Sequence, residues 1–461
     1  MQEQTIHIPN YLLGATTTAD SSEELRDIEG NLIARVPADP ITHRIGNILD
    51  YAVAAQERLR QTTIADRMDK LREIWGLLPD GELLTAVINV HGTPRQDLET
   101  ELAHFKEWAI HPEHFFERVK PFAGNDWQRS FDSGRYTALG PTTLVLAGSM
   151  EIGEQWLVLS HYLLAGTHMI VRPSSRDLAT PAFFQRMYEV GYSDGGQMVM
   201  FLSDTAGTIT LNALIRQTPV STLFSSDETR KRLTAGVEGE HRINGYGSGL
   251  PMVYVTSNAN DLDHIAAQCG ESAVFGHGKR CISTTPIFVH ESKTSAFVDA
   301  LVQHARTLRK GNPQEPYTDI GYFSSDEQAA LGRMLEAYTF GFSCPYGYET
   351  LHGDGLLRDL LVVRADQQNP FLGHEIPAPV IAVMPYRDLS DAVVVANAAL
   401  QQRGVAKYIR ASVFGSGSDK RQVERELQAH LVTHNRGTTD FNCYEPHQGT
   451  FFMLDALEVR T

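Results

Sequence analysis

Residues 276–289 read Gly-His-Gly-Lys-Arg-Cys-Ile-Ser-Thr-Thr-Pro-Ile-Phe-Val, a glycine-rich turn that leads through one cysteine, Cys281, into an apolar run. The apolar run predicts a short strand. Glycines allow the backbone to approach a ligand closely, and the neighbouring Lys279 and Arg280 favour a thiolate over a thiol. These features are typical of a nucleophilic cysteine, and the alternative interpretation is a buried structural cysteine.

Strand and helix signals alternate on both sides of this turn. Continuous apolar runs predict parallel strands that are buried on both faces, over 142–147, 168–172, 198–202, 220–224, 251–256, 285–289 and 378–383. Helical spacing of apolar residues lies between most of these runs. The alternation predicts two doubly wound α/β units, whose ligands bind beyond the carboxyl ends of the strands. The sequence contains no GxGxxG, so it lacks the usual dinucleotide-binding motif.

The first 120 residues carry other signals. Gly30-Asn31 predicts the turn of a hairpin within 25–36. Thr63, followed three residues later by Asp66, is a predicted N-cap. Apolar spacing predicts three helices, over 48–59, 64–78 and 93–109. We interpret these stripes as core packing.

Composition limits the classes of function. The 461 residues carry a formal net charge of -16, which argues against nucleic acid as the main partner. No apolar run approaches the ~20 residues that a membrane-spanning helix needs, so no membrane insertion is expected. The start of the chain does not resemble a signal peptide, and the four scattered cysteines form no CxxC pair, so a cytoplasmic location is expected. The 18 histidines are dispersed, and we predict no metal site.

Six short motifs follow one another in a fixed order. They are Gly140-Pro141, Arg172-Pro173-Ser174, Phe224-Ser225-Ser226, Gly245-Tyr246-Gly247-Ser248, Gly278-Lys279-Arg280-Cys281 and Glu375-Ile376-Pro377-Ala378-Pro379. Their order and spacing, from about 140 to 400, resemble the aldehyde dehydrogenase superfamily. That family has a Lys-Pro-Ser strand end, a Phe-Thr-Gly-Ser turn, a Glu-Leu-Gly-Gly turn, a Gly-Gln-x-Cys nucleophile turn and a Glu-Ile-Phe-Gly-Pro loop.

The resemblance implies an α/β fold with two doubly wound domains and a small oligomerisation arm. Residues 1–120 and 139–244 would bind a nicotinamide cofactor, and 245–436 would form the catalytic domain. A hairpin at 121–138 and the tail at 437–461 would form the arm of a homodimer or homotetramer.

The resemblance also implies roles for individual residues. Cys281 would be the nucleophile, and Ser149 falls near the family's oxyanion-stabilising asparagine. His447 could donate a proton; His277 is nearer in sequence and no better supported. Cofactor contacts would come from Arg172, Ser174, Ser175, Phe224, Ser225, Ser226 and Glu375. The cofactor is NADPH or NADH, with NADPH slightly favoured because Arg172 and Arg176 could pair with a 2′-phosphate.

One departure from the family pattern bears on the reaction. Gly245 stands where hydrolytic members carry the glutamate that activates water, and glycine cannot take a proton. Loss of this base is typical of acylating aldehyde dehydrogenases and luminescence-type acyl reductases. We therefore predict interconversion of an acyl thioester, acyl-CoA or carrier-bound, with an aldehyde. The alternatives are oxidation of an aldehyde to a carboxylic acid, and a non-catalytic oligomeric partner with the same fold.

Overall fold

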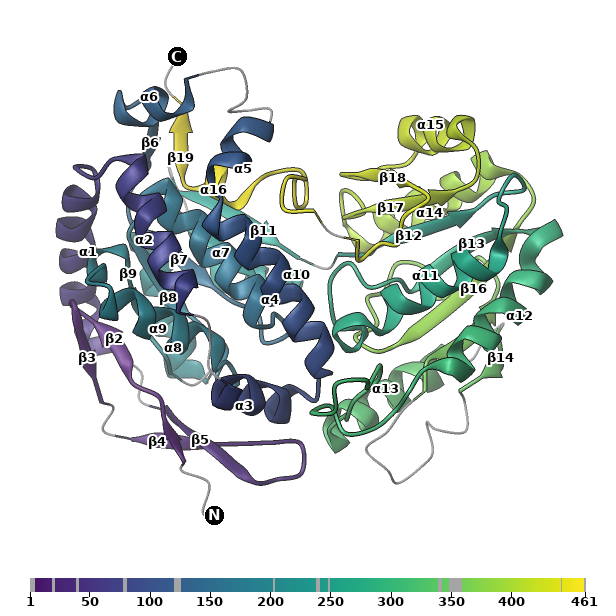
Figure 1. The fold of residues 1–461 in the computed structure, drawn as a ribbon, viewed down its shortest axis with the longest axis horizontal. Helices are drawn as coiled ribbons and strands as arrows, with labels where there is room; N and C mark the ends of the chain where they lie inside the picture. Colours follow the sequence, from purple (N-terminus) through teal and green to yellow (C-terminus); the bar gives the residue numbers. More distant parts are fainter. Residues whose placement is uncertain are drawn as a thin grey trace.

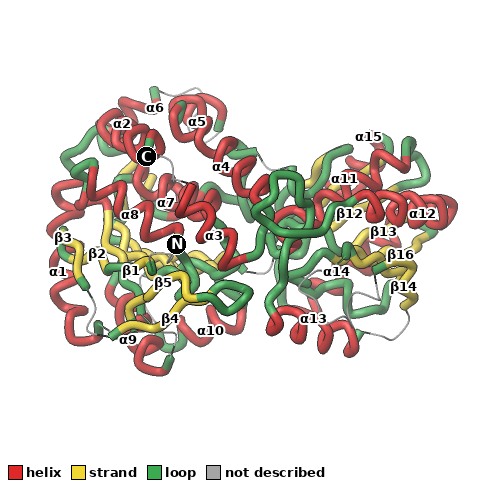
Figure 2. The backbone as a smooth tube through the Cα atoms, turned by 60° about the horizontal axis from the view of Figure 1, so that its bottom comes forward, coloured by secondary structure: helices red, strands yellow, loops and turns green. Residues whose placement is uncertain are grey.

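The computed structural model describes residues 5–18, 21–38, 41–77, 81–119, 126–201, 204–237, 241–247, 249–338, 342–347, 359–440 and 442–459. These residues form two α/β units that lie side by side, each built on a seven-stranded sheet (Figures 1 and 2). The predicted α/β class is therefore confirmed. Among the described residues, no helix has the length and apolar character needed to cross a membrane.

The first unit has a sheet of strand order β11-β10-β7-β8-β9-β2-β3. Its parallel strands are β7 (Thr142–Val145), β8 (Met169–Arg172), β9 (Gly196–Met198), β10 (Val220–Phe224) and β11 (Arg242–Tyr246). β2 (Asn10–Leu12) and β3 (Ala15–Thr17) extend it antiparallel. Every residue of β7, β8 and β10 is buried, which explains the unbroken apolar runs in the sequence.

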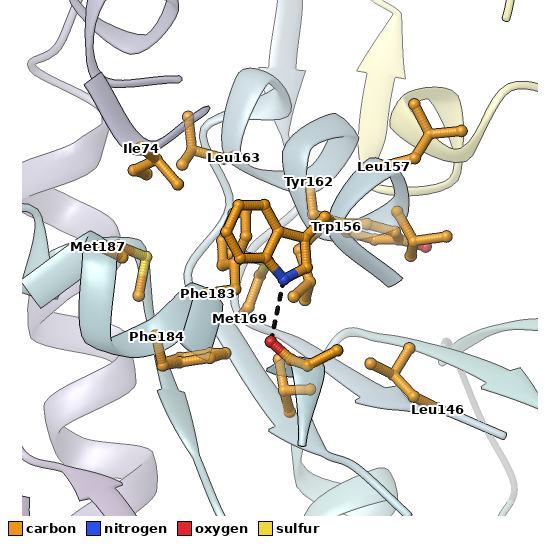
Figure 3. Packing of buried hydrophobic residues seen from close by; sticks show 14 of the residues in the cluster. Ile74, Leu146, Trp156, Leu157, Tyr162, Leu163, Met169, Phe183, Phe184 and Met187 are labelled. Atoms are coloured by element: carbon orange, nitrogen blue, oxygen red, sulfur yellow. Dashed lines mark hydrogen bonds between the residues drawn. The ribbon is translucent and has the colours of Figure 1, made fainter. Parts of the chain in front are cut away.

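Helices cover both faces of this sheet. One face packs against α2 (Ile64–Gly76), α4 (Arg95–Ile110), α7 (Ile152–Ala165) and α8 (Ala179–Glu189). Figure 3 shows Trp156 of α7 within this core, where its Nε1 donates to the carbonyl oxygen of Ala179 at 2.9 Å. The other face packs against α1 (Ile45–Leu59) and α9 (Thr205–Gln217). Further elements of the unit are α3 (Gly81–His91), α5 (Glu113–Arg118) and α10 (Asp227–Thr234).

The second unit has the strand order β14-β15-β16-β13-β12-β17-β18. These strands are β12 (Met252–Val255), β13 (Pro286–His290), β14 (Phe342–Tyr346), β15 (Leu361–Ala365), β16 (Val380–Tyr386), β17 (Ala411–Phe414) and β18 (Val432–His434). All neighbouring pairs are parallel except β14 with β15. α11 (Leu262–Val274) and α12 (Glu291–Thr307) contribute to one core. α13 (Ser325–Ala337), α14 (Leu389–Arg403) and α15 (Gly417–Glu426) contribute to the other.

The hairpin predicted within 25–36 is present as β4 (Ser22–Arg26) and β5 (Leu32–Pro37), and β1 (Ile6–His7) pairs with β5. The hairpin expected at 121–138 is wrong for the described residues. There the chain forms α6 (Trp127–Asp132), which Asp126 caps, and β6 (Tyr136–Ala138). β6 pairs antiparallel with β19 (Leu457–Val459), so its partner strand comes from the other end of the chain.

The tail is not only an arm. α16 (Phe452–Asp455) packs against α7, and both Phe452 and Met453 are buried in the core of the first unit. Apolar side chains at these positions favour docking onto the sheet unit over an exposed extension. The tail therefore passes between the two units and brings the residues around 447 beside the cysteine turn (Figure 1).

Candidate active site

The turn that carries Cys281 is fixed by its backbone. It follows the 3-10 helix Phe275–Gly278, in which Gly276 and Gly278 have φ of 57° and 65°. A Cβ at position 278 would lie 2.5 Å from the carbonyl oxygen of Ala378, so only glycine fits there. The Asp97 carboxylate of α4 accepts the backbone N–H of Gly276 at 2.9 Å. These contacts hold the thiol at the boundary between the two units.

His277, which lies closer to Cys281 in sequence than His447 does, has a structural role. Its side chain is fully buried, and its Nε2 accepts the backbone N–H of Gly321 at 3.0 Å. Its ring stacks on Phe323 with a centroid distance of 4.4 Å. The side chain is thus committed to packing between the turn and the segment before α13.

The two cations beside Cys281 are occupied by carboxylates. Lys279 Nζ lies 2.6 Å from Glu327. The Arg280 guanidinium, 2% exposed, lies 2.6 Å from Glu154, 2.9 Å from Glu101 and 3.1 Å from Glu151. Arg280 still favours the Cys281 thiolate, as expected, but burial and the neighbouring carboxylates outweigh it, so the expected resting thiolate is not formed.

This environment raises the pKa of the Cys281 thiol well above its ordinary value. Burial is the largest cause, and the charges of Glu154 and Glu375 add to it, whereas Arg280 opposes it. At neutral pH the resting side chain is the thiol, so a base must take its proton when it attacks a carbonyl.

A cavity of about 260 Å³ opens at the sulfur. Its walls are mainly apolar side chains of both units, among them Phe105, Met150, Leu157, Val158, Phe224, Phe275, Ile282 and Phe452. Cys281 and His447 both line it, and their Sγ and Nε2 atoms are 4.0 Å apart. The structure thus brings the predicted nucleophile and the predicted proton donor together.

His447 is held in a tight turn of the tail. Its backbone N–H donates to the carbonyl oxygen of Thr450 at 2.7 Å, and Thr450 N–H donates back at 3.1 Å. The imidazole packs against the rings of Tyr246 and Phe452. Burial, together with the charges of Arg410 and His430, lowers the pKa of His447 to about 4. The imidazole is therefore neutral at pH 7 and can accept the thiol proton.

The raised thiol pKa predicts slow, base-dependent modification of Cys281. Its alkylation by iodoacetamide should be roughly tenfold slower at pH 7 than that of a free cysteine, and the rate should still rise above pH 9. Peptide mass spectrometry at several pH values measures this rate at Cys281 alone. A rate that reaches its plateau below pH 7 would show a resting thiolate and contradict this description of the site.

Position 245 offers no base, and an arginine side chain lies beside it. Gly245 pairs with Leu223 in the sheet, and a Cβ added to it would lie 2.5 Å from Nη1 of Arg230. Arg230, on α10, is paired with Asp227 at 2.8 Å. An arginine side chain therefore lies beside the position at which the resemblance places the water-activating glutamate of hydrolytic enzymes.

Ser149 lies in an exposed turn between β7 and α7. Its neighbour Met150 lines the cavity with Cys281, whereas Ser149 is not among the lining residues. The backbone N–H of Cys281, which lies at the cavity, is a second candidate donor to an oxyanion.

The predicted cofactor residues lie at the carboxyl ends of neighbouring strands. Ser174 and Ser175 follow β8, and Ser225 and Ser226 follow β10, with β7 between the two strands. The Ser225 hydroxyl is buried without a hydrogen-bond partner among the described residues. Ser226 caps α10 by accepting from Thr229 N–H. These hydroxyls and the unpartnered Ser225 oxygen fit a polar ligand such as a dinucleotide.

The remaining predicted cofactor residues, Phe224, Arg172 and Glu375, have other surroundings. Phe224 stacks on Tyr246 at 4.7 Å and lines the cavity at Cys281. Arg172 is buried and donates to the carbonyl oxygen of Phe201 at 3.1 Å, and Arg176 donates to that of Val90 at 2.7 Å. One nitrogen of each guanidinium donates to a neutral backbone carbonyl, which leaves both positive charges in place, so the slight preference for NADPH stays a prediction. Glu375 is exposed, yet close enough for its charge to act on Cys281.

Sequence reasoning missed the three carboxylates around Arg280. Glu101 lies 179 residues from Arg280 along the chain, and Glu151 and Glu154 begin α7. Burial raises the pKa of Glu101 to about 8, and that of Glu154 also rises. The only sequence signal for this cluster was the spacing of Glu151 and Glu154, which lie about one helical turn apart just after the turn that follows β7.

Comparisons with known proteins find similar sequences and a similar fold. The model of the aldehyde dehydrogenase family matches residues 16–450. A putative aldehyde dehydrogenase of Staphylococcus saprophyticus is 24% identical over 449 residues, covering 92% of this chain and 90% of that protein. An NADP(+) succinate-semialdehyde dehydrogenase of Mycolicibacterium paratuberculosis is 23% identical over 272 residues, which cover 57% of this chain and 56% of that protein.

Solved structures show the same fold. Lactaldehyde dehydrogenase from Escherichia coli superposes with a TM-score of 0.84 at 16% identity, covering 99% of each chain. Indole-3-acetaldehyde dehydrogenase complexed with NAD+ superposes with a TM-score of 0.84 at 18% identity, covering 100% of this chain and 97% of that one.

Proposed function

The chain belongs to the aldehyde dehydrogenase family, and from this premise we propose that it interconverts an acyl thioester and an aldehyde through an acyl group carried on Cys281. The acyl donor would be acyl-CoA or a carrier-bound acyl group, and the cofactor NADH or NADPH. One observation supports the proposal above all: the Cys281 thiol lies 4.0 Å from the neutral imidazole of His447, at an apolar cavity.

The chain's own residues perform the acyl transfer as follows. His447 Nε2 takes the proton of Cys281 Sγ as the sulfur attacks the carbonyl carbon. The backbone N–H of Cys281 donates a hydrogen bond to the oxyanion, and one such donor contributes about 3 kcal/mol in known enzymes. Ser149 lies outside the cavity lining and takes no part in this step. The carbon–sulfur bond to the carrier then breaks, and His447 returns the proton to the departing thiol.

Residues after β8 and β10 would hold the cofactor, namely Ser174, Ser175, Ser225 and Ser226, together with Arg172, Phe224 and Glu375. When bound, a nicotinamide supplies hydride to the acyl carbon or accepts it from that carbon. In the reducing direction Cys281 leaves as its carbon–sulfur bond breaks and the aldehyde forms. The sulfur then takes up a proton from solvent, which His447 can relay, and the thiol is restored.

The absence of a carboxylate at position 245 supports a thiol rather than water as acyl acceptor. Arg230 lies beside this position, and an arginine side chain has no atom that accepts a proton from water. The acyl group on Cys281 should therefore persist until a thiol or hydride removes it.

We expect aldehyde oxidation to depend on a thiol acceptor. With an aldehyde and NAD+ or NADP+, CoA should raise the steady rate at least about tenfold, because attack by a thiol replaces slow hydrolysis. Nicotinamide absorbance gives the rate, and chromatography identifies the product as thioester or free acid. Rapid formation of free acid without CoA would contradict the proposed function.

Oxidation of an aldehyde to a carboxylic acid is the second candidate function. Glu154 lines the cavity beside Cys281 and has a raised pKa, so it could take the place of the missing base. The relatives named as aldehyde and succinate-semialdehyde dehydrogenases also favour it. The same assay separates the two functions, because this one needs no CoA.

The oligomer and its arm remain part of the proposal. β18 is an edge strand of the second sheet, and β6 with β19 forms a separate two-stranded ribbon. An unpaired strand edge favours pairing with another strand. We propose a cytoplasmic homodimer or homotetramer built with 121–138 and 437–461, with residues up to 244 binding the cofactor and 245–436 providing Cys281.

A non-catalytic partner of the same fold would bind no nicotinamide cofactor. Quenching of the protein's fluorescence by added NADH or NADPH tests this alternative.

A further inference from the structure

We propose that Glu154 makes the cavity at Cys281 selective for uncharged, apolar acyl groups and aldehydes, and excludes those that carry a second carboxylate. This inference rests on the proposed role of Cys281 and goes further by naming the substrate class and the residue that sets it.

The walls of the cavity fit an apolar chain. Eight of its lining side chains are apolar or aromatic and come from both units: Phe105, Met150, Leu157, Val158, Phe224, Phe275, Ile282 and Phe452. A hydrocarbon chain placed among them leaves water and gains contacts, whereas a carboxylate there would lose its hydration. A carboxylate would therefore need a cation in the cavity wall.

Arg280 cannot serve as that cation. It is the only Arg or Lys among the described lining residues, and its terminal nitrogens already contact Glu154, Glu101 and Glu151. Its Nε lies against the backbone of Gly276, where an added Cβ would be 2.6 Å away. A substrate carboxylate would have to displace one of three carboxylates that are already in place.

The lining histidines do not supply a positive charge either. His447 is neutral at pH 7. His104 Nε2 lies 3.4 Å from the buried sulfur of Cys443, and burial lowers the pKa of His104. The cavity therefore offers no cation to an anionic substrate.

Glu154 presents the negative charge of the cluster to the cavity. Its side chain is 25% exposed, whereas Glu101 and Glu151 are 6% and 3% exposed. Glu154 and Glu101 both line the cavity, and Glu151 does not. Asp440 is the third acidic residue in the lining, and its carboxylate is paired with Arg436 at 2.9 Å. A second carboxylate on a substrate held between the cavity walls would be repelled by Glu154.

Two aldehydes of the same shape test the selectivity in the wild-type protein. Succinate semialdehyde and 4-methylpentanal differ mainly in replacing a carboxylate by an isopropyl group. Without cofactor, each is titrated as a protectant of Cys281 against iodoacetamide at mildly alkaline pH, and peptide mass spectrometry reports the modified fraction. We expect 4-methylpentanal to protect at concentrations at least about tenfold lower. Equal protection, or better protection by succinate semialdehyde, would overturn the inference.

Two variants assign the effect to Glu154. Glu154→Gln keeps a hydrogen-bond acceptor for Arg280 and removes the charge, so the preference for 4-methylpentanal should fall at least about threefold. Glu151→Gln removes a charge from the same guanidinium but does not line the cavity, so its preference should stay closer to that of the wild type. An equal fall in both variants, with both folded by circular dichroism, would assign the effect to the whole cluster and refute the role given to Glu154.

Failure of this inference can be distinguished from failure of the proposed function. The protection assay needs neither cofactor nor CoA. It therefore measures aldehyde binding in the cavity, whether a thiol or water accepts the acyl group in the full reaction. If neither aldehyde protects Cys281, the cavity does not bind the reacting carbonyl, and both proposals are contradicted. If both protect equally, only the charge selectivity is contradicted.

Discussion

Cys281→Ala should abolish turnover, lowering kcat/KM for an acyl thioester or an aldehyde by about 10⁴-fold or more. The loss follows from chemistry rather than folding, because the side chain is only half-buried and its turn is held by backbone contacts of Gly276 and Gly278. Without the sulfur no acyl group can be carried on the protein. Nicotinamide absorbance measures the loss, and circular dichroism with a thermal melt shows that the variant is folded.

Cys443→Ala is the matched control for this prediction. Cys443 is buried, and its sulfur contacts His104, which lines the same cavity. Its pKa is raised by burial, so it is a thiol in the resting protein. We expect Cys443→Ala to retain turnover within about tenfold of the wild type, because it removes packing and no reacting atom. Strong activity in Cys281→Ala, with loss in Cys443→Ala, would identify Cys443 as the nucleophile and contradict the role given to Cys281.

Arg280→Met should lower the free energy of unfolding by about 3–5 kcal/mol at neutral pH, because it leaves buried carboxylates without their cation. In the wild type the guanidinium contacts three of them, and Glu101 and Glu151 are buried. Urea denaturation followed by circular dichroism measures the change.

The deficit of Arg280→Met should depend on pH with a definite sign. The folded-state pKa of Glu101 is already raised to about 8, and without Arg280 it rises further. A carboxyl with a raised folded pKa contributes stability that is present below its unfolded pKa and is lost as the pH rises through the folded value. The variant should therefore be nearest to the wild type at about pH 5 and furthest from it above pH 8.

Lys279→Met is the matched control for Arg280→Met. Lys279 adjoins Arg280 and makes one ion pair, with Glu327, whose side chain is 30% exposed. Removing such a partly solvated pair should cost no more than about 1 kcal/mol. An equal decrease in the free energy of unfolding in the two variants would show that the buried cluster stabilises the fold no more than a partly exposed ion pair does.

Local sequence patterns predicted the elements well where one segment alone determines the structure. The apolar runs at 142–147 and 220–224 are strands because both faces of a parallel sheet are covered. Thr63 caps α2 and forms a capping box with Asp66, as their spacing predicts. The strand expected at 198–202 is instead β9, Gly196–Met198, since sheet pairing rather than apolar content sets its bounds.

Contacts between distant segments could not be predicted in this way. Sequence motifs predicted roles for Cys281 and His447 separately. The two residues are 166 positions apart in the sequence, and only the folded path of the tail brings their side chains together. Arg280 shows the same limit: next to a cysteine it indicates thiolate stabilisation, yet three carboxylates engage its charge. Gly245 could be identified as a missing base from its position, whereas Arg230 beside it is visible only in the folded chain.

The central claim is that Cys281 carries the acyl group, and mass spectrometry of the protein after incubation with an acyl-CoA, without nicotinamide cofactor, tests it most directly. We predict a mass increase equal to the acyl group, located on the peptide that contains Cys281 and removed by added thiol. An unmodified Cys281 peptide, with the acyl group on Cys443 or on no residue, would contradict the account.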